Sequence, residues 1–334
     1  MSGGPRVFVT RPLPAGGTDP LAATDGPGPP CEIIQRTEDE PLDKEGLIAA
    51  LEDGIDGVVA VLTERFDADV YAAGKGRLRV VANVAVGYDN IDVAAATAAG
   101  VVICNTPGIV DDPTADVAFL LILAACRRAS EAEAALRNGQ WVGFHMEAFL
   151  GRDIHGATLG LVGYGGIARA VARRAAGFNM EVIHHARRPT GEPGYVADLH
   201  ELLGLSDIVS LHVPLSPESR HLIGRAELAA MKPTAVLVNT ARGPVVDEEA
   251  LAEALEQGVI FAAGIDVYER EPAVHPRLLA APGAVLLPHI GTATVARRTA
   301  MSQIASRSAR AVLAGEMPEN ALNPEAADSH LSRD

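Results

Sequence analysis

The sequence predicts an α/β protein made of two doubly wound domains with a cleft between them. Apolar runs of strand length alternate with helical stretches along most of the chain, which is typical of parallel sheets covered by helices. The chain has 334 residues, which is too many for one small core. Ala, Val, Leu and Gly dominate, whereas aromatic residues make up only 4%. Small residues of this kind let helices lie close on a sheet.

The first alternating series covers about the first hundred residues. Its expected strands are 7–10, 32–35, 56–62, 79–85 and 101–105, and its expected helices include 42–54 and 91–100. Residues 12–30 are rich in Pro and Gly, so we expect a loop there with at most one short helix. This stretch departs from the regular helix that would usually follow a first strand.

The second series begins after a long helix at about 113–130 and an irregular connection over 138–156. Its expected strands are 157–163, 181–186, 207–213, 235–240, 261–267 and 284–289. We expect a helix between the N-cap Asp247 and Gly258, and a last helix at about 294–314. The predicted domains are therefore 1–103, joined by 292–334, and 104–291.

Composition excludes several classes of function. The net charge of −15 argues against nonspecific nucleic-acid binding, which needs a basic face. Cys31, Cys104 and Cys126 are far apart, so we expect buried free thiols and no zinc site. Residues 1–14 do not resemble a signal peptide, and the apolar run 117–126 is too short to span a bilayer about 30 Å thick. We expect a soluble, cytoplasmic protein without metal, membrane or nucleic-acid partners.

A glycine-rich turn predicts a dinucleotide site. Gly163-x-Gly165-x-x-Ala168 follows an apolar strand and opens an Ala-rich helix. Gly163 would make the tight turn, and Gly165 would let the backbone approach a pyrophosphate at the helix N-terminus. Ala168 would let helix and strand pack closely. Strand, turn, helix and second strand occur in the required order, so we favour a Rossmann-like NAD(P) domain over a ligand-free turn.

The end of the second strand of this domain indicates the kind of dinucleotide. NAD sites usually carry Asp or Glu here to bind the ribose 2′-hydroxyl. This chain has Ala186, followed by Arg187 and Arg188. The missing carboxylate removes repulsion of a 2′-phosphate, and the arginines supply charged donors for it. We therefore expect NADP(H) to be preferred, with NAD(H) as a possible second cofactor; the alternative is a solvated surface turn.

Three strings late in the chain carry the reactive side chains. They are NTARGPVVDE (239–248), GIDVYEREP (264–272) and PHIG (288–291). They place Arg242, Glu271 and His289 beside turns. An arginine can hold a carboxylate, a carboxylate can orient a histidine, and a histidine can pass a proton. With a hydride source nearby, these three groups suit the reduction of a 2-keto acid.

Taken together, these strings resemble the D-isomer-specific 2-hydroxyacid dehydrogenase family, and within it the glyoxylate/hydroxypyruvate (2-ketoaldonate) reductase branch. The resemblance covers nearly the whole chain. It also includes VAVGYDNIDV (84–93), NTPGIVDDPTADVAFLLIL (105–123) and HVPLSPESRHLI (212–223). It implies a flavodoxin-like substrate domain at 1–103 and a Rossmann-like domain at 104–291.

The resemblance also implies roles for individual residues. Arg242 would hold the substrate carboxylate and polarise the keto oxygen. His289 would donate the proton, with Glu271 orienting its ring. The backbone N–H groups of Val86 and Gly87 would bind the carboxylate as well. The implied cofactor-binding residues are Thr114, Gly163, Gly165, Gly166, Ile167, Ala186, Arg187, Arg188, Pro214, Ser219, Thr240, Ala241, Asp266 and Gly291.

Further features have a plain structural interpretation. Glu248 and Glu249 are interpreted as the solvated first turn of a helix. His184 and His185 are adjacent on a strand and point to opposite faces, so they cannot form one metal site with each other. Gly166 stands where the family often has Arg, which removes one possible phosphate contact. The family resemblance also implies a homodimer, in which the segment around Trp141 crosses the partner.

The leading hypothesis is therefore an NADPH-dependent reductase of glyoxylate, hydroxypyruvate or a 2-ketoaldonate that yields the D-2-hydroxy acid. A dinucleotide-sensing corepressor or scaffold on the same fold is the alternative from another class. The lack of a basic or low-complexity extension favours the enzyme. Phosphoglycerate and phosphite dehydrogenases share the fold, and the short tail after the last helix disfavours the former.

Overall fold

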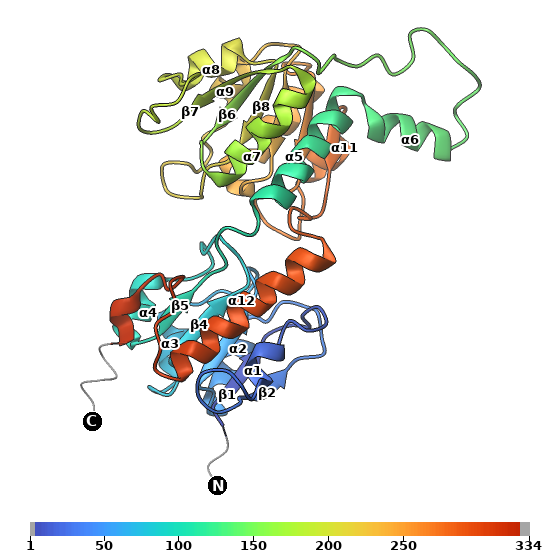
Figure 1. Cartoon of the computed structure of the whole chain (residues 1–334). Helices are drawn as coiled ribbons and strands as arrows, with labels where there is room; N and C mark the ends of the chain where they lie inside the picture. Colours follow the sequence, from blue (N-terminus) through green and yellow to red (C-terminus); the bar gives the residue numbers. More distant parts are fainter. Residues whose placement is uncertain (1–3, 328–334) are drawn as a thin grey trace. The chain divides into compact units, whose positions relative to one another are not determined.

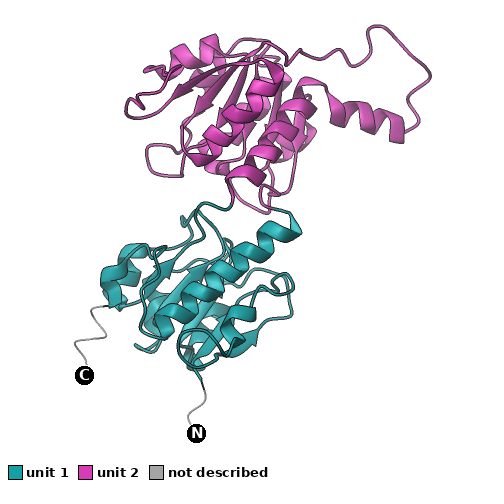
Figure 2. Cartoon of the chain, viewed as in Figure 1, with its two compact units in different colours: residues 1–109, 293–334 teal, residues 110–292 magenta. Residues whose placement is uncertain are grey.

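The computed structural model describes residues 4–327 and divides the chain into two compact units (Figure 2). Unit 1 contains residues 1–109 and 293–334, and unit 2 contains residues 110–292. The boundaries predicted from the sequence are 103/104 and 291/292. Residues 1–3 and 328–334, which belong to the predicted first domain, lie outside the described residues.

Unit 1 is built on a parallel sheet whose described strands have the order β2-β1-β3-β4-β5. The strands are β1 (Arg6–Val9), β2 (Glu32–Gln35), β3 (Gly57–Ala60), β4 (Val80–Asn83) and β5 (Val102–Cys104). The helices are α1 (Asp19–Ala22), α2 (Lys44–Glu52), α3 (Ala68–Ala73), α4 (Val93–Ala99) and α12 (Val295–Leu313), with a 3-10 turn η3 (Pro324–Ala327). This strand order is the flavodoxin-like one. Helix α12 lies along one face of the sheet, where Ala305 and Ala309 pack with Val59 and Val80 (Figure 1).

The Pro- and Gly-rich stretch 12–30 contains the short helix α1, as predicted. It is fastened to α12 by Arg310, which is only 2% exposed. The guanidinium donates hydrogen bonds to the carbonyls of Pro20 and Pro27 at 2.9 Å and of Gly28 at 3.1 Å. A buried cation is tolerated only when its donors are satisfied. The arginine thus holds this loop against α12.

Unit 2 is built on a second parallel sheet, whose described strands have the order β11-β10-β9-β8-β6-β7. The strands are β6 (Thr158–Val162), β7 (Glu181–His185), β8 (Ile208–Leu211), β9 (Val236–Asn239), β10 (Ala262–Ile265) and β11 (Ala284–Leu286). The helices are α5 (Asp111–Cys126), α6 (Ala129–Arg137), α7 (Gly166–Ala175), α8 (Leu199–Leu205), α9 (Arg225–Ala230), α10 (Glu248–Glu256) and α11 (Pro276–Ala280), with 3-10 turns η1 (Ala176–Phe178) and η2 (Gly243–Val245). An isolated parallel bridge between His184 and Tyr195 adds a rudimentary strand outside β7, which completes the Rossmann order.

The predicted α/β class with two doubly wound sheets is confirmed. Both faces of the unit 2 sheet are covered, as buried parallel strands require. Helices α5 and α7 lie against one face, where small residues such as Ala118 and Ala168 allow close packing (Figure 1). The other face packs against α8, α9, α10 and α11 through residues such as Leu203, Leu228 and Leu251. The three cysteines are buried free thiols, also as predicted.

One predicted helix is wrong in extent. The sequence predicts a single helix at about 113–130, but α5 ends at Cys126 and α6 begins at Ala129. Arg128 between them has φ +51°, in the left-handed region, and pairs with Glu131. The break falls where the close-set apolar residues of α5 end, because α6 has no buried residue and gains nothing by continuing along the core.

The segment 138–151 after α6 runs out from the body of unit 2 as an irregular arm (Figure 1). Its large apolar side chains face solvent in the single chain, with Val142 86% and Phe144 84% exposed. No helix within residues 4–327 has the length and apolar character needed to cross a lipid bilayer.

Candidate active site

The predicted site residues of unit 2 gather at one edge of its sheet. Parallel strands end at the same edge, and in doubly wound folds ligands bind there. The loop after β6 carries the glycine turn, and the loop after β8 carries Pro214 and Ser219. Thr240, Ala241 and Arg242 follow β9, Asp266 follows β10, and His289 follows β11.

The glycine turn has the geometry of a phosphate cradle. Gly163 has φ +88°, and a Cβ there would lie 2.6 Å from the carbonyl oxygen of His212, so no larger residue fits. Gly165 is exposed and has open space where a side chain would begin. Helix α7 starts next, and no side chain caps its N-terminus, so its first N–H groups are available to an anion. These residues fit a dinucleotide pyrophosphate.

Gly166 and Ile167 open this helix. A side chain at position 166 would collide with the carboxylate of Asp111, which comes from the start of α5. A larger residue at position 166 would therefore require the Asp111 side chain to move. Ala168 is fully buried against the sheet, as predicted for the third motif position.

The turn after β7 presents Arg187 and Arg188 to solvent. Three contacts hold it in shape. Tyr195 donates its hydroxyl to the carbonyl of Ala186 at 3.3 Å, and Thr190 lies 2.7 Å from Nε2 of His184. Arg169 of α7 forms an ion pair with Glu192. No acidic side chain stands at the place where an NAD site usually has one.

His184 anchors the same turn to the glycine loop. Its ring stacks on Tyr164 with centroids 3.8 Å apart, and Arg169 lies over the Tyr164 ring at 4.7 Å. Burial lowers the pKa of His184, so the imidazole stays neutral. As predicted, His185 points to the other face of the strand; its Nδ1 lies 3.1 Å from the carbonyl of Val196.

The central pair of the site is His289 and Glu271. Nδ1 of His289 lies 2.7 Å from Oε2 of Glu271, and the other carboxylate oxygen accepts the N–H of Tyr268 at 2.9 Å. Their side chains are 28% and 27% exposed, so the pair is partly sheltered yet reachable. Burial opposes ionisation of Glu271, but the hydrogen bond from His289 and the charges of His289 and Arg242 hold its pKa below the ordinary value. An ionised Glu271 can only accept, so Nδ1 carries the proton and Nε2 is left for a substrate.

Asp266 holds the histidine loop in place. It is 1% exposed, and its carboxylate accepts the N–H groups of Ile290 at 2.7 Å and Gly291 at 2.8 Å. Its backbone carbonyl accepts the N–H of His289 at 2.8 Å. A Cβ on Gly291 would lie 3.6 Å from Oγ1 of Thr114, so these cofactor candidates come together. The predicted contact of Asp266 with nicotinamide stays a prediction.

Arg242 stands beside this pair through the loop after β9. Its carbonyl accepts a hydrogen bond from Nδ2 of Asn239 at 2.9 Å, and its Nη1 donates to the carbonyl of Ala241 at 2.8 Å. Oγ1 of the neighbouring Thr240 is buried and has no hydrogen-bond partner within residues 4–327. A buried hydroxyl usually has a hydrogen-bond partner, and a bound ligand could supply the partner for Thr240.

The loop after β8 is ordered by Ser219. Its hydroxyl donates to the carbonyl of Pro214 at 2.7 Å and accepts the N–H of Ser216 at 2.8 Å. Hydrogen bonding to Ser216 lowers the pKa of Glu218, and the charge of Arg187 contributes. The arginine turn and this loop are thus electrostatic neighbours.

In unit 1, Val86 and Gly87 lie in the loop after β4. Asn105 donates to the carbonyl of Val86 at 2.8 Å, and Asn83 donates to the carbonyl of Gly87 at 3.0 Å. For their N–H groups, the structure of residues 4–327 shows no acceptor. The side-chain amides of Asn83 and Asn105 fix the two carbonyls. The N–H groups of Val86 and Gly87, which have no acceptor among residues 4–327, could therefore bind an anion. That these groups face His289 stays a prediction.

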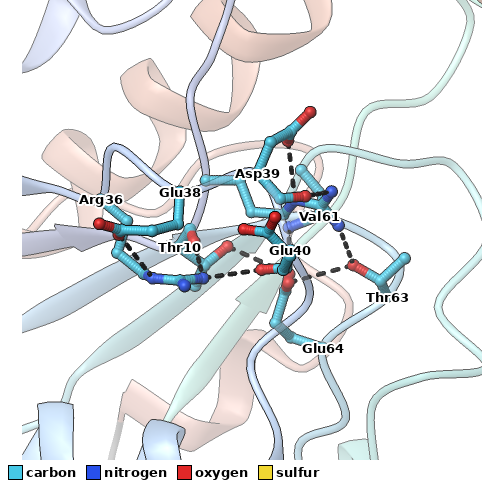
Figure 3. Close-up of polar contacts among 9 residues, drawn as sticks. Thr10, Arg36, Glu38, Asp39, Glu40, Val61, Thr63 and Glu64 are labelled. Atoms are coloured by element: carbon cyan, nitrogen blue, oxygen red, sulfur yellow. Dashed lines mark hydrogen bonds and ion pairs between the residues drawn. The ribbon is translucent and has the colours of Figure 1, made fainter.

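Sequence reasoning missed Glu64, which organises the neighbouring loop of unit 1. It is fully buried after β3 and accepts hydrogen bonds from Oγ1 of Thr10 at 3.1 Å and the N–H of Val61 at 3.2 Å. Thr63 donates to its other oxygen at 3.0 Å, and Figure 3 shows these groups converging on the carboxylate. An acid soon after a strand of four buried residues was the signal available.

The prediction for Glu248 is wrong. It is 7% exposed, whereas a solvated first-turn acid was expected. Its Oε1 accepts the N–H of Glu269 at 2.5 Å and its Oε2 the N–H of His275 at 3.2 Å. The neighbouring Glu249 is exposed, as predicted. The partners of Glu248 lie more than twenty residues away in the sequence, so the helix pattern alone could not reveal them.

A separate hollow of about 230 Å³ lies at the opposite edge of the unit 2 sheet. Its lining includes Ala157, Asp207 and Thr234, which precede strands. It contains none of the predicted site residues. Within residues 4–327, no three His, Cys, Asp or Glu side chains come together as metal ligands.

Comparison with known proteins identifies the family of this chain. The family model described as D-isomer specific 2-hydroxyacid dehydrogenase, NAD binding domain, matches residues 119–291. The glyoxylate reductase of Thermococcus gammatolerans is 43% identical, and the match covers 96% of both chains. A solved structure from Thermus thermophilus has a TM-score of 0.87 with 43% identity over 95% of this chain and 99% of that one.

A second solved structure is the NADPH-dependent glyoxylate/hydroxypyruvate reductase of Sinorhizobium meliloti in complex with NADP and malonate. It has a TM-score of 0.83 and 31% identity over 96% of this chain and 98% of that one. Sequence identities of 43% and 31% over 96% of this chain indicate membership of one family and not merely a shared fold. The chain belongs to the D-isomer-specific 2-hydroxyacid dehydrogenase family and is an NAD(P)-dependent oxidoreductase.

Proposed function

We propose that this protein reduces a small 2-keto acid to the D-2-hydroxy acid, with NADPH as the preferred reductant. Glyoxylate, hydroxypyruvate and 2-ketoaldonates are the candidate substrates. The observation that carries the proposal is the 2.7 Å contact between His289 and Glu271 at the sheet edge that also holds Arg242 and the glycine turn. The names of the Thermococcus and Sinorhizobium relatives support the choice of substrates.

The chemistry follows from the groups at this edge. A bound nicotinamide supplies the hydride for the keto carbon. Nε2 of His289 donates its proton to the keto oxygen as negative charge develops there, and the imidazole becomes neutral. Arg242 holds the substrate carboxylate with its planar fork and draws electron density from the keto oxygen. The N–H groups of Val86 and Gly87 would bind the same carboxylate from unit 1.

Glu271 acts through His289. Its ionised carboxylate accepts from Nδ1, which fixes the ring and stabilises the imidazolium needed for reduction. In the reverse direction the neutral imidazole would accept the proton of the hydroxy acid, and the same carboxylate would stabilise the charge that the ring then gains.

The preference for NADPH is supported by Ala186, Arg187 and Arg188. The arginines are exposed on a turn that three contacts hold in shape, and alanine stands at position 186, where an NAD site usually has an acid. The Sinorhizobium relative was solved with NADP, which is consistent with this preference. We also propose that the protein is a cytoplasmic homodimer, since the apolar arm would be covered by a second copy.

The test is an absorbance assay at 340 nm with NADPH and a panel of 2-keto acids. We expect oxidation of NADPH with glyoxylate or hydroxypyruvate. The variant His289→Gln should lower kcat by about 10²–10⁴-fold, because the general acid is lost. The matched control is His200→Gln, since His200 lies on α8 and pairs with Glu227 away from the site. Failure of every 2-keto acid to oxidise NADPH or NADH would contradict the proposal.

A further inference from the structure

Glu248 fastens both sides of the loop that carries Glu271. Its two carboxylate oxygens accept the N–H groups of Glu269 at 2.5 Å and His275 at 3.2 Å. Glu269 lies two residues before Glu271, and His275 lies four residues after it. One buried carboxylate therefore binds the loop at both ends, and Glu271 lies between the two residues that it binds.

The contact between the two segments is reciprocal. Oε1 of Glu269 accepts the backbone N–H of Glu248 at 2.9 Å, which satisfies a free donor of the first turn of α10. Oε2 of Glu269 lies 3.3 Å from Nε2 of His221. Each glutamate thus binds the main chain of the other, and we call this arrangement the Glu248–Glu269 clamp.

The clamp joins the segment of Arg242 to the segment of Glu271. The 3-10 turn η2 begins directly after Arg242 and leads within five residues to Glu248. Gly243 of this turn packs directly on the backbone of Tyr268, and any Cβ at Gly243 would collide with it. Tyr268 in turn donates its N–H to Glu271 at 2.9 Å. The two segments are consequently one block.

The residues next to η2 reinforce the block. His221 donates its N–H to the carbonyl of Pro244 at 2.8 Å, and Ile223 donates to the carbonyl of Val245 at 3.1 Å. The same stretch of chain that holds η2 thus also supplies the imidazole that faces Glu269. Helix α10, however, does not depend on Glu248 to begin, because Asp247 already caps it through the N–H of Ala250 at 2.9 Å.

A buried acid at this point is costly, and burial raises the pKa of Glu248 against the lowering effect of its two backbone hydrogen bonds. A carboxylate suits this buried position better than an apolar residue, because its two oxygens accept the two backbone N–H groups of Glu269 and His275. A glutamine has only one acceptor oxygen and could satisfy one of the two N–H groups. The neighbouring Glu249 makes no such contact within residues 4–327 and reaches only Arg277, at 4.0 Å.

We propose that Glu248 and Glu269 are positioning residues for the reduction: their clamp sets the place of the Glu271–His289 pair relative to Arg242. The inference rests on the proposed function, because it assigns a purpose to this spacing. Among residues 4–327, the hydrogen bonds and ion pairs of Glu248 and Glu269 do not include the imidazole of His289. Their effect is transmitted through the backbone on either side of Glu271.

The first measurement is steady-state kinetics of Glu248→Gln, Glu269→Ala and the control Glu249→Gln. Misplacement of a catalytic group by about 1 Å can cost on the order of 10²-fold in rate. We expect kcat of Glu248→Gln to fall by about 10- to 100-fold, with a smaller change in KM for the cofactor, whose glycine turn lies elsewhere. Glu249→Gln should match the wild type. Glu248→Gln with the wild-type kcat would overturn the proposal.

The second measurement does not need turnover. The Nδ1–H proton of His289, hydrogen-bonded to Glu271, should give a far-downfield resonance that is absent in His289→Gln. We expect this resonance to shift or broaden in Glu248→Gln and to stay unchanged in Glu249→Gln. An unchanged resonance in Glu248→Gln, alongside a loss of thermal stability, would reduce the clamp to a structural role and overturn the proposal.

The two measurements separate the two proposals. If the wild type reduces no 2-keto acid while the resonance responds to Glu248→Gln, the proposed function fails and the clamp stands. If the wild type is active and neither quantity responds, the clamp fails alone. Should Glu248→Gln not fold, Glu269→Ala is decisive, because it keeps both acceptor oxygens of Glu248 and removes the side chain that accepts the N–H of Glu248; a wild-type kcat and resonance in that variant would then overturn the proposal.

Discussion

At the scale of the residue, His289 is held by its backbone as firmly as by Glu271. Its φ of +54° lies in the left-handed region, which costs a non-glycine residue roughly 1–2 kcal/mol. Three hydrogen bonds to Asp266, from the N–H groups of His289, Ile290 and Gly291, compensate for this cost. The unusual backbone aims the imidazole at Glu271, and the buried aspartate keeps it there.

We expect Ala186 to decide the charge at the ribose end of the proposed cofactor site. The variant Ala186→Asp would place a carboxylate beside the 2′-phosphate, where it repels, and beside the 2′-hydroxyl of NADH, where it accepts a hydrogen bond. Charged hydrogen bonds contribute about 1.5–3 kcal/mol, so the NADPH/NADH ratio of kcat/KM should fall by about 10-fold or more. Steady-state kinetics with both cofactors measures this ratio. Ala68→Asp, an equal change of net charge at an exposed position of unit 1, should leave it unchanged. A constant ratio in Ala186→Asp would show that the arginine turn does not read the 2′-phosphate.

His212 predicts how stability changes with pH. Burial lowers its pKa from the ordinary 6.5 to about 3, and its Nδ1 has no hydrogen-bond partner among residues 4–327. Between these two values the unfolded chain binds a proton that the folded chain does not. The free energy of unfolding should therefore fall as pH falls from 6.5 toward 3, by up to about 1.4 kcal/mol per pH unit from this group.

Urea denaturation at about pH 6.5, 5.5 and 4.5, values inside the window between the unfolded and folded pKa of His212, tests this dependence. In His212→Asn the slope should be smaller than in the wild type, whereas the exposed His145→Asn should keep the wild-type slope. His184, whose pKa burial also lowers, contributes equally to all three proteins. Parallel slopes in the wild type and His212→Asn would show that His212 does not carry the effect.

At the scale of the element, strands and caps could be read from the sequence, because local pattern determines them. The predicted strand 32–35 matches β2, and Asp247 caps α10 through its side chain. The end of α5 could not be read, because no glycine or proline marks it and Arg128 adopts the left-handed conformation itself. Such a break depends on where the core ends, which is a property of the folded unit.

The same distinction holds for the site. The catalytic roles of Arg242, Glu271 and His289 stay a prediction. Their place beside strand ends could be predicted, because the strings that carry them follow apolar runs of strand length. The way in which they are held could not. Glu248 and Glu64 look like ordinary surface or turn acids until their partners, remote in the sequence, are brought to them by the fold. Whether a carboxylate is buried depends on tertiary packing, and the local spacing of apolar and polar residues does not reveal it.

At the scale of the whole molecule, the two units differ in what they supply. Unit 2 carries the glycine turn, the arginine turn and the Arg242, Glu271 and His289 side chains. Unit 1 offers backbone N–H groups at Val86 and Gly87, in a loop framed by buried amides. The candidate reaction centre on unit 2 is therefore charged, whereas the candidate anion site on unit 1 consists of neutral backbone groups and adds no titratable side chain.

The arm over 138–151 is the part of the chain that we expect to form the contact between two copies. Trp141, Val142 and Phe144 are 62%, 86% and 84% exposed in the single chain, which is unusual for large apolar side chains so close together. If a second copy covers them, the double variant Val142→Ser/Phe144→Ser should change the sedimentation coefficient from that of a dimer to that of a monomer. Leu279→Ser removes another exposed apolar side chain, on α11 and outside the arm, and should leave the dimer intact.

The chain has one tryptophan, so its fluorescence reports on the arm alone. Trp141 emission should move to longer wavelength in the double variant, as the indole passes from a covered to a solvated site. A wild type that sediments as a monomer, or a double variant that stays dimeric with unchanged emission, would show that the arm does not hold two copies together.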